Sequence, residues 1–123
     1  MSYPTYDMNF ADFQGRNWQR AMTAEKFAKC RDWTLNDWAV ALTGEVGEFC
    51  NLSKKVSRGD LTLDEARADL GKELADVLTY ADLLMSKLGL NTDEQLSAKF
   101  EEVSERIGYR AERVATPTPG DAK

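Results

Sequence analysis

Two pairs of acidic residues, each pair spaced three positions apart, are the part of this chain best suited to chemistry. Their four members are Glu45, Glu48, Glu73 and Asp76. Residues at positions i and i+3 of a helix lie on one side of it, with Cβ atoms roughly 5–6 Å apart, and packed helices lie about 8–10 Å apart. Two facing helices therefore place the four carboxylates around one small volume. Because such a cluster repels itself unless protons or cations neutralise it, the pattern predicts a divalent-cation site.

The positions of these acids on their helices distinguish them from other acidic residues. Spacing alone is uninformative, since the chain has 21 acidic residues and Glu102 and Glu105 share the same spacing. On a helical wheel, Glu45 falls inside an apolar arc and its three partners lie at the edges of such arcs, whereas Glu102 and Glu105 lie opposite the apolar side. Carboxylates are rarely buried unless they are paired or bind a metal. The first two pairs therefore form the candidate site.

The absence of histidine from the sequence restricts both the metal and the chemistry. It excludes a histidine general base, the usual zinc sites and the Glu-x-x-His di-iron bundle. Oxygen ligands alone favour Mg²⁺, for which Mn²⁺ is a possible substitute. Mg²⁺ in proteins keeps several waters and commonly bridges carboxylates to substrate phosphates, so a site of this kind suits chemistry on phosphates.

Charge and hydropathy exclude several classes of protein. The net charge of −5 argues against a nucleic-acid binder, which normally carries a basic stripe. No apolar run approaches the roughly 18 residues of a membrane span, and the amino terminus lacks a basic segment followed by an apolar core, so neither a span nor a secretory signal is expected. Cys30 and Cys50 show no metal-binding spacing. We expect two reduced, packed cysteines in a cytoplasmic protein.

The apolar periodicity is helical throughout, which predicts an all-α, four-helix bundle-like fold with up-down topology. The expected helices cover about residues 9–29, 37–57, 62–88 and 91–108. Thr62 and Glu65 form a capping box at the start of the third helix. Gly59, Gly89 and Gly108 are natural helix stops. We expect one domain over residues 1–114 and a flexible tail over residues 115–123.

Each expected helix carries an apolar face that we expect to be buried. These faces are formed by Phe10, Phe13, Met22 and Phe27 in the first helix, by Trp38, Leu42, Val46, Phe49 and Val56 in the second, by Leu70, Leu74, Val77, Leu78, Ala81, Leu84, Met85 and Leu88 in the third, and by Leu96, Phe100, Val103 and Ile107 in the fourth.

The segments around the two acidic pairs resemble a known family. The first reads Ala41-Leu-Thr-Gly-Glu-Val-Gly-Glu-Phe49, and the second reads Lys72-Glu-Leu-Ala-Asp-Val-Leu-Thr-Tyr80. They are similar to the MazG-like family of all-α nucleoside triphosphate pyrophosphatases, whose signature is E-x-x-E, a gap of variable length and E-x-x-D. The gap here is 24 residues. The resemblance extends over roughly Arg31 to Tyr109 and includes the glycines and the Asp-Val-Leu-x-Tyr context.

The resemblance implies a reaction. The four acids would hold Mg²⁺, and the enzyme would cleave nucleoside triphosphates, often deoxynucleotides, between the α- and β-phosphates, in nucleotide pool sanitation. A metal-activated water oriented by a carboxylate would attack the α-phosphorus, and Glu45 and Glu48 are both candidates for orienting it. Relatives assemble as dimers or tetramers, and the surplus of apolar positions suits a homodimer or homotetramer.

The substrate needs contacts besides the metal. The candidate basic residues are Lys54, Lys55, Arg58, Lys72, Lys99 and Arg106, and the resemblance favours Lys55 and Lys99. Trp33 is the candidate for stacking on the base, a contact that contributes about 1–3 kcal/mol, with Trp18 and Trp38 as alternatives. Tyr80, at the border of the third helix's acidic side, completes the candidate substrate contacts.

The chain departs from the family at two places. Val103 and Ser104 lie where many relatives carry an asparagine, and Asp37-Trp38 replaces a frequent Asn-Leu pair. The base preference therefore cannot be carried over from the family.

Two alternatives stay open. The first is another member of the same superfamily, such as a dUTPase-like or phosphoribosyl-ATP pyrophosphohydrolase-like protein, in which the metal site is similar and the substrate differs. The second is a non-catalytic helical interaction module, in which the acids are surface groups or form interhelical salt bridges. A Glu45→Gln variant separates these classes, because it abolishes metal-dependent hydrolysis and leaves an interaction module bound to its partner.

Overall fold

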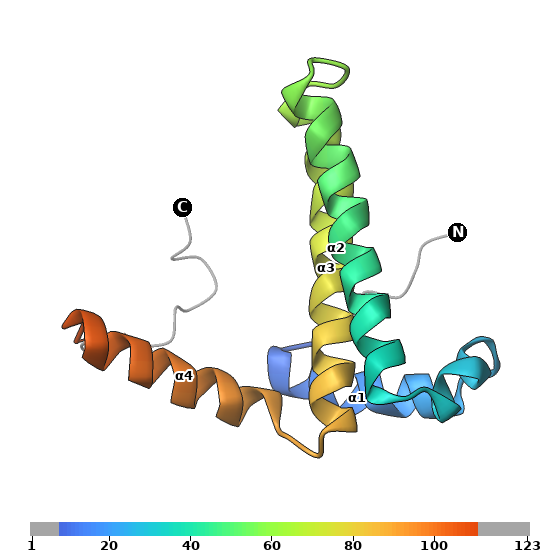
Figure 1. Cartoon of the computed structure of the whole chain (residues 1–123), viewed down its shortest axis with the longest axis vertical. Coiled ribbons are helices and arrows are strands. Elements are labelled where there is room, and N and C mark those ends of the chain that lie inside the picture. The colour runs from blue at the N-terminus through green and yellow to red at the C-terminus, as the bar shows by residue number, and fades with distance from the viewer. Residues whose placement is uncertain (1–7, 111–123) are drawn as a thin grey trace. The chain divides into compact units, whose positions relative to one another are not determined.

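The computed structural model describes residues 8–110, and these residues form helices and no strand. The helices are α1 (Phe10–Thr23), the 3₁₀ helix η1 (Glu25–Asp32), α2 (Leu35–Ser57), α3 (Leu63–Lys87) and α4 (Thr92–Ile107). Figure 1 shows their order along the chain. The prediction of an all-α protein is therefore confirmed for this part of the chain.

The chain divides into two compact units, residues 1–92 and residues 93–123. The first unit contains α1, η1, α2 and α3, and the second contains nearly all of α4. A single domain over residues 1–114 and an up-down arrangement of four helices both stay predictions. The predicted tail, residues 115–123, lies outside the described residues.

Local sequence signals set the ends of the two long helices. Thr62 and Glu65 form the expected capping box on α3, each side chain bonding the other's backbone N–H at 3.1 Å. Thr34 and Asp37 form a second capping box on α2. Each box satisfies backbone donors that a helix start leaves without an intrahelical acceptor. After the helices, Gly59, Gly89 and Gly108 have φ angles of +85°, +72° and +74°, as expected of glycine stops.

The prediction of one helix over residues 9–29 is wrong in its second half. α1 ends at Thr23, and Ala24 has an extended backbone (φ −70°, ψ 130°) before η1 begins. The carbonyl oxygen of Ala24 accepts hydrogen bonds from the backbone N–H of Phe27 and from the Arg31 guanidinium, both at 3.0 Å. These two donors satisfy the carbonyl that the break exposes, so the chain turns here at little cost.

Within the first unit, α2 and α3 form an antiparallel hairpin, and α1 crosses it near the end of α3 (Figure 1). The side-chain amide of Asn17 joins α1 to α3, because its nitrogen donates to the Thr79 carbonyl oxygen at 3.0 Å and to Asp82 Oδ2 at 2.9 Å. The core lies at this crossing. It contains Ala21, Cys30, Trp38 and Leu83, with Trp18, Met22, Phe27, Trp33, Tyr80 and Leu84 packed around them.

Several residues predicted to be buried are exposed. Val46, Leu74 and Leu78 have exposed fractions of 41%, 47% and 57%. In the hairpin, α2 and α3 cover one side of each other, and only the crossing end is also covered by α1 and η1, so apolar residues farther along lie open. Phe10, Leu88, Leu96, Phe100 and Ile107 are exposed as well.

The two cysteines differ from the expectation of two packed side chains. Both are free, but Cys30 is buried in the core whereas Cys50 is exposed on α2.

Candidate metal centre

The hairpin brings carboxylates from both predicted acidic pairs together. Glu45 on α2 and Glu73 and Asp76 on α3 each offer one oxygen, and these three oxygens lie within 4.8 Å of one another. Glu45 and Glu73 are half-buried, and Asp76 is exposed. The i, i+3 spacing and the antiparallel packing of α2 on α3 produce this meeting point, as expected from the sequence geometry.

Glu48 is the fourth member of this acidic cluster. It is exposed, and it lies close enough to Glu45 and Glu73 to raise the pKa of each. Its negative charge adds to the repulsion within the cluster and raises the pKa of both neighbours.

Burial and the neighbouring negative charges raise the pKa values of Glu45 and Glu73. Burial is the largest cause that raises the pKa of Glu45 above its ordinary value, followed by the negative charges of Glu48, Asp76 and Glu73. Burial also leads the causes that raise the pKa of Glu73, followed by its hydrogen bond with Glu48 and the charge of Glu48. Both shifts have the sign expected when carboxylates are forced close together with no cation between them.

One oxygen of the cluster has no partner in the described part of the chain. Glu73 Oε2 exposes less than 1 Å² to solvent and accepts no hydrogen bond from residues 8–110. A carboxylate oxygen withdrawn from water requires a donor or a cation. Oxygen ligands without histidine or thiolate are the donor set that suits Mg²⁺ or Mn²⁺, so the residues present fit such an ion.

A pocket of about 310 Å³ adjoins the cluster on the side of Glu48 and Glu73. Lys55 from α2 and Lys72 from α3 line it, together with Asn51 and Asp69. We call it the lysine pocket. It brings two of the predicted basic residues, and their positive charges, beside the carboxylates.

A smaller cavity of about 150 Å³ adjoins the cluster on the side of Glu45 and Asp76. We call it the inner cavity. Its other walls include Tyr80 from α3, Asn17 and Arg20 from α1, and Phe27 from η1. Burial is the main cause that raises the pKa of the Tyr80 phenol, and the charge of Glu45 is the next. Tyr80 therefore lies beside the carboxylates, where the sequence placed it.

The other predicted substrate residues lie elsewhere. Trp33 packs edge-on against Trp38, with ring centroids 4.9 Å apart, at the margin of the core. Lys54 is exposed in the last turn of α2, and Arg58 pairs with Asp60 at 2.9 Å. Lys99, which pairs with Glu102 at 2.9 Å, and Arg106 both belong to α4 in the second unit.

Sequence reasoning did not find Asn17, Arg20 and Phe27, which reach the inner cavity from α1 and η1. Asn17 and Arg20 precede the break at Ala24 and Phe27 follows it, and the apolar periodicity did not reveal that break. One signal was present: Asp82 interrupts the apolar run from Tyr80 to Met85. A buried acid requires a donor, and that donor is Asn17.

No protein-family model, curated protein or solved structure matches the chain. The resemblance to the MazG-like family therefore rests on the two acidic motifs and their context alone. Among the described residues, no helix is long and apolar enough to span a membrane.

Proposed function

We propose that this protein is a Mg²⁺-dependent nucleotide pyrophosphohydrolase. It hydrolyses nucleoside or deoxynucleoside triphosphates to the monophosphate and pyrophosphate, in the cytoplasm, and so serves nucleotide pool sanitation. The observation that carries the proposal is the meeting of Glu45, Glu73 and Asp76 within 4.8 Å, with Glu48 in contact. The withdrawn, unpartnered Glu73 Oε2 supports a cation as the missing partner.

Glu45, Glu48, Glu73 and Asp76 are the residues that hold the metal in this proposal. Bound Mg²⁺ supplies charge neutralisation on the phosphates and lowers the pKa of a coordinated water. Mn²⁺ is expected to substitute, since it accepts the same oxygen ligands.

In this proposal, side chains of the protein neutralise the phosphates and orient the attacking water. Lys55 and Lys72 neutralise the phosphate chain from the lysine pocket, beside Glu48 and Glu73. Glu45 or Glu48 accepts a hydrogen bond from the attacking water and orients it.

The exposed apolar side chains favour self-association as well. Val46 on α2 and Leu74 and Leu78 on α3 are exposed, and exposed apolar side chains are a feature of contact surfaces. A homodimer or homotetramer is therefore part of the proposal. The same observation favours the interaction module as the second candidate function.

Product analysis tests the proposal. The pure protein is incubated with a panel of ribo- and deoxynucleoside triphosphates and with phosphoribosyl-ATP, in Mg²⁺ and in chelator. Monophosphate and pyrophosphate formed only with metal support the reaction, and the preferred substrate separates a broad pyrophosphohydrolase from the dUTPase-like and phosphoribosyl-ATP alternatives. Absence of turnover on every substrate, for a protein whose melting temperature Mg²⁺ does not change, would favour the interaction module.

Glu45→Gln is the test variant, and Glu102→Gln is its matched control. Glu102 has the same i, i+3 acidic spacing but lies exposed on α4, paired with Lys99. The proposal predicts a loss of turnover of at least about a hundredfold in Glu45→Gln, in line with removal of one group that acts in the transition state. It predicts unchanged turnover in Glu102→Gln.

A further inference from the structure

Lys55 and Lys72 line the lysine pocket without pairing with the acids beside them. Glu48, Asp69 and Glu73 line the same pocket. In the described part of the chain, however, neither lysine forms an ion pair with any carboxylate. Side chains of both charges therefore border one space without neutralising each other.

The spacing of Asp69 and Lys72 does not explain why they stay unpaired. They lie three positions apart on α3, and so do Asp64 and Arg67, which form an ion pair at 2.8 Å on the same helix. Helical residues at this spacing are neighbours on the helix surface, so Lys72 has a partner of opposite charge within reach. It lines the lysine pocket instead, with its charge available to an anion.

The lysine pocket extends from the acidic cluster toward the tip of the hairpin. Glu48, Leu52 and Lys55 are four and three positions apart, so they share one face of α2. At 1.5 Å per residue, Lys55 lies about 10 Å beyond Glu48 along the helix. On α3, Lys72 directly precedes Glu73. Two ammonium groups on long, flexible stems therefore border a space that begins at the carboxylates.

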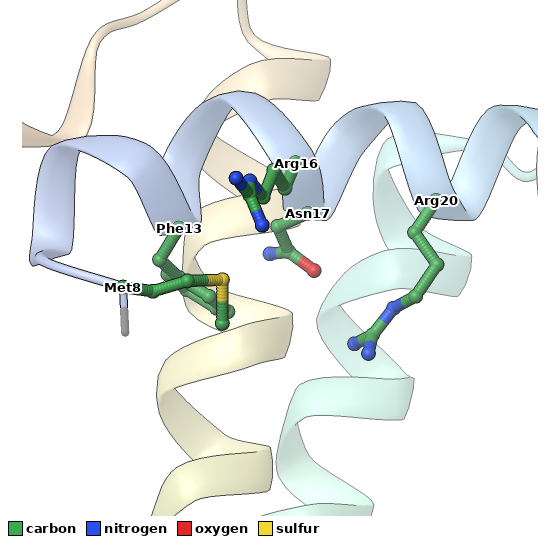
Figure 2. A pocket seen from close by; sticks show the side chains of 5 residues that line it. All are labelled: Met8, Phe13, Arg16, Asn17 and Arg20. Carbon is green, nitrogen blue, oxygen red and sulfur yellow. The ribbon is translucent and has the colours of Figure 1, made fainter. Parts of the chain in front are cut away.

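A second pocket also brings two basic side chains together. Arg16 and Arg20 lie one turn apart on α1 and line a space of about 200 Å³ with Met8, Phe13 and Asn17 (Figure 2). None of these five residues is acidic. The inner cavity does adjoin the cluster, but Arg20 is the one basic residue among its walls. Of these three spaces, the lysine pocket alone combines two basic side chains with carboxylates of the cluster.

The two products of the proposed reaction differ in charge. The oxygen of water bonds to the α-phosphorus, the bond from this phosphorus to the bridging oxygen breaks, and the bridging oxygen leaves as part of pyrophosphate. The proton of the water passes to the carboxylate that orients it and then to solvent. Pyrophosphate carries more negative charge than a nucleoside monophosphate. Because phosphate oxygens form charge-assisted hydrogen bonds with ammonium groups and the attraction grows with charge, two lysines favour pyrophosphate.

From these observations we infer that the lysine pocket retains pyrophosphate after hydrolysis, so that pyrophosphate leaves after the monophosphate and inhibits the enzyme. Lys55 and Lys72, which the acids of the protein leave unpaired, hold it beside Glu48 and Glu73. Product release limits the turnover of many enzymes. Sustained turnover therefore requires a second reaction that hydrolyses pyrophosphate to phosphate. This inference rests on the proposed function for the reaction that forms pyrophosphate.

Calorimetric titration measures the affinity for pyrophosphate without turnover. Inorganic pyrophosphate and a panel of nucleoside monophosphates are titrated into the protein at one ionic strength and one free Mg²⁺ concentration, since pyrophosphate itself binds Mg²⁺. We expect pyrophosphate to bind at least about tenfold more tightly than any monophosphate. Equal affinities for pyrophosphate and the monophosphates would overturn the inference.

Lys72→Met and Lys87→Met are the matched variants for this titration. Both lysines are exposed on α3, but Lys87 lies in its last turn and is not among the residues that line the lysine pocket. We expect Lys72→Met to remove most of the preference for pyrophosphate and Lys87→Met to keep it. Equal losses in the two variants would overturn the assignment of the lysine pocket.

Product inhibition gives the order of release. At a fixed free Mg²⁺ concentration, pyrophosphate is expected to inhibit competitively against the triphosphate, because the last product to leave binds the same free enzyme as the substrate. The monophosphate is expected to inhibit noncompetitively. Competitive inhibition by both products, or by the monophosphate alone, would overturn the order.

Removal of pyrophosphate is expected to sustain the rate. Progress curves of triphosphate hydrolysis should bend as pyrophosphate accumulates, and an added enzyme that hydrolyses pyrophosphate should straighten them. Curves that bend equally with and without that enzyme would contradict inhibition by pyrophosphate.

Binding and turnover, measured in parallel, separate failure of this inference from failure of the proposed function. Metal-dependent hydrolysis, with binding of pyrophosphate that does not depend on Lys72, would overturn the inference and leave the pyrophosphohydrolase proposal standing. Binding of pyrophosphate that depends on Lys72, in a protein that hydrolyses no triphosphate, would support the pyrophosphate site and overturn the hydrolase.

Discussion

Carboxylate oxygens of Glu45 and Glu73, two residues on different helices, lie within 4.8 Å of one another. Both carboxylates are half-buried, and burial raises the pKa of each above the ordinary value of 4.5. Two like charges at this distance oppose folding unless a proton or a cation lies between them. The relationship has consequences that can be measured without any substrate.

The first prediction concerns pH. The folded protein holds protons on Glu45 and Glu73 at pH values where the unfolded chain has released them, so the folded state binds more protons above pH 4.5. By linkage, the free energy of unfolding in chelator is expected to fall as pH rises from 4.5 through the raised pKa values of these two residues. Denaturant melts at a series of pH values measure this slope.

The pH prediction has an internal control. Hydrogen bonds from the backbone and side chain of Thr34 lower the pKa of Asp37 from 3.8, and the equivalent bonds from Thr62 lower that of Glu65 from 4.5. These two groups add stability above their unfolded values that is lost as pH falls, so their effect lies at lower pH and has the opposite sign. A Glu45→Gln, Glu73→Gln double variant should flatten the slope above pH 4.5. A slope unchanged in that variant would show that other groups cause it.

The second prediction concerns metal. Mg²⁺ is expected to raise the melting temperature, because an ion that binds the folded state alone stabilises it by about 2.7 kcal/mol at a hundredfold excess over its Kd. The rise should grow with pH, since cation and protons compete for the same carboxylates. Glu73→Gln should remove the effect, and Glu102→Gln should keep it. A rise of equal size in both variants would place the bound metal elsewhere.

The third prediction concerns the lysine pocket. Lys72→Met removes a positive charge beside Glu48 and Glu73, and we expect kcat/KM for triphosphates to fall about tenfold, mostly through KM. The Lys55→Met, Lys72→Met double variant should fall further and lose much of its dependence on ionic strength. Lys87→Met, at the exposed end of α3, is the charge-matched control. Steady-state kinetics at two salt concentrations measure these effects. Equal changes of kcat/KM in all three variants would contradict the assignment of Lys55 and Lys72 as phosphate contacts.

The fourth prediction concerns the buried polar contact that positions α1. Asp82 is 2% exposed, and its two oxygens accept from Asn17 Nδ2 at 2.9 Å and from Thr92 Oγ1 at 2.5 Å. Asp82→Leu removes the acceptor of the Thr92 hydroxyl and one of the two acceptors of Asn17 Nδ2, and is expected to reduce the free energy of unfolding by about 3 kcal/mol. Asp82→Asn keeps an acceptor for Asn17 and a donor for the Thr92 hydroxyl, so its cost should be under about 1.5 kcal/mol. Similar losses in the two variants would mean that shape, rather than hydrogen bonding, governs this position.

Much of the acidic cluster could be predicted from sequence because its geometry is local. The i, i+3 spacing puts Glu45 beside Glu48 and Glu73 beside Asp76 on their own helices, and the short turn after Gly59 returns α3 against α2. Helix caps and glycine stops are local signals too, and both capping boxes and stops are found near the expected ends.

The positions of Asn17 and Arg20, which precede the break at Ala24 and line the inner cavity, could not be predicted from local signals. At the start of η1, the Arg31 guanidinium donates a hydrogen bond to the Ala24 carbonyl oxygen. Apolar periodicity gives no information about such a contact. The inner cavity depends in turn on where α1 crosses α3, which the Asn17–Asp82 pair fixes across 65 residues of sequence. The exposure of Leu74 and Leu78 was missed for a related reason, since a helical wheel shows an apolar face without showing what covers it.

Hydrolysis in water enriched in ¹⁸O tests the central claim most directly. A nucleoside triphosphate is incubated with the protein and Mg²⁺, and the products are separated and weighed by mass spectrometry. The account predicts that one ¹⁸O enters the nucleoside monophosphate and none enters pyrophosphate, because water attacks the α-phosphorus. It also predicts no reaction in chelator or in Glu45→Gln. Label in the pyrophosphate, release of inorganic phosphate with a nucleoside diphosphate, or turnover that persists without a divalent cation would contradict it.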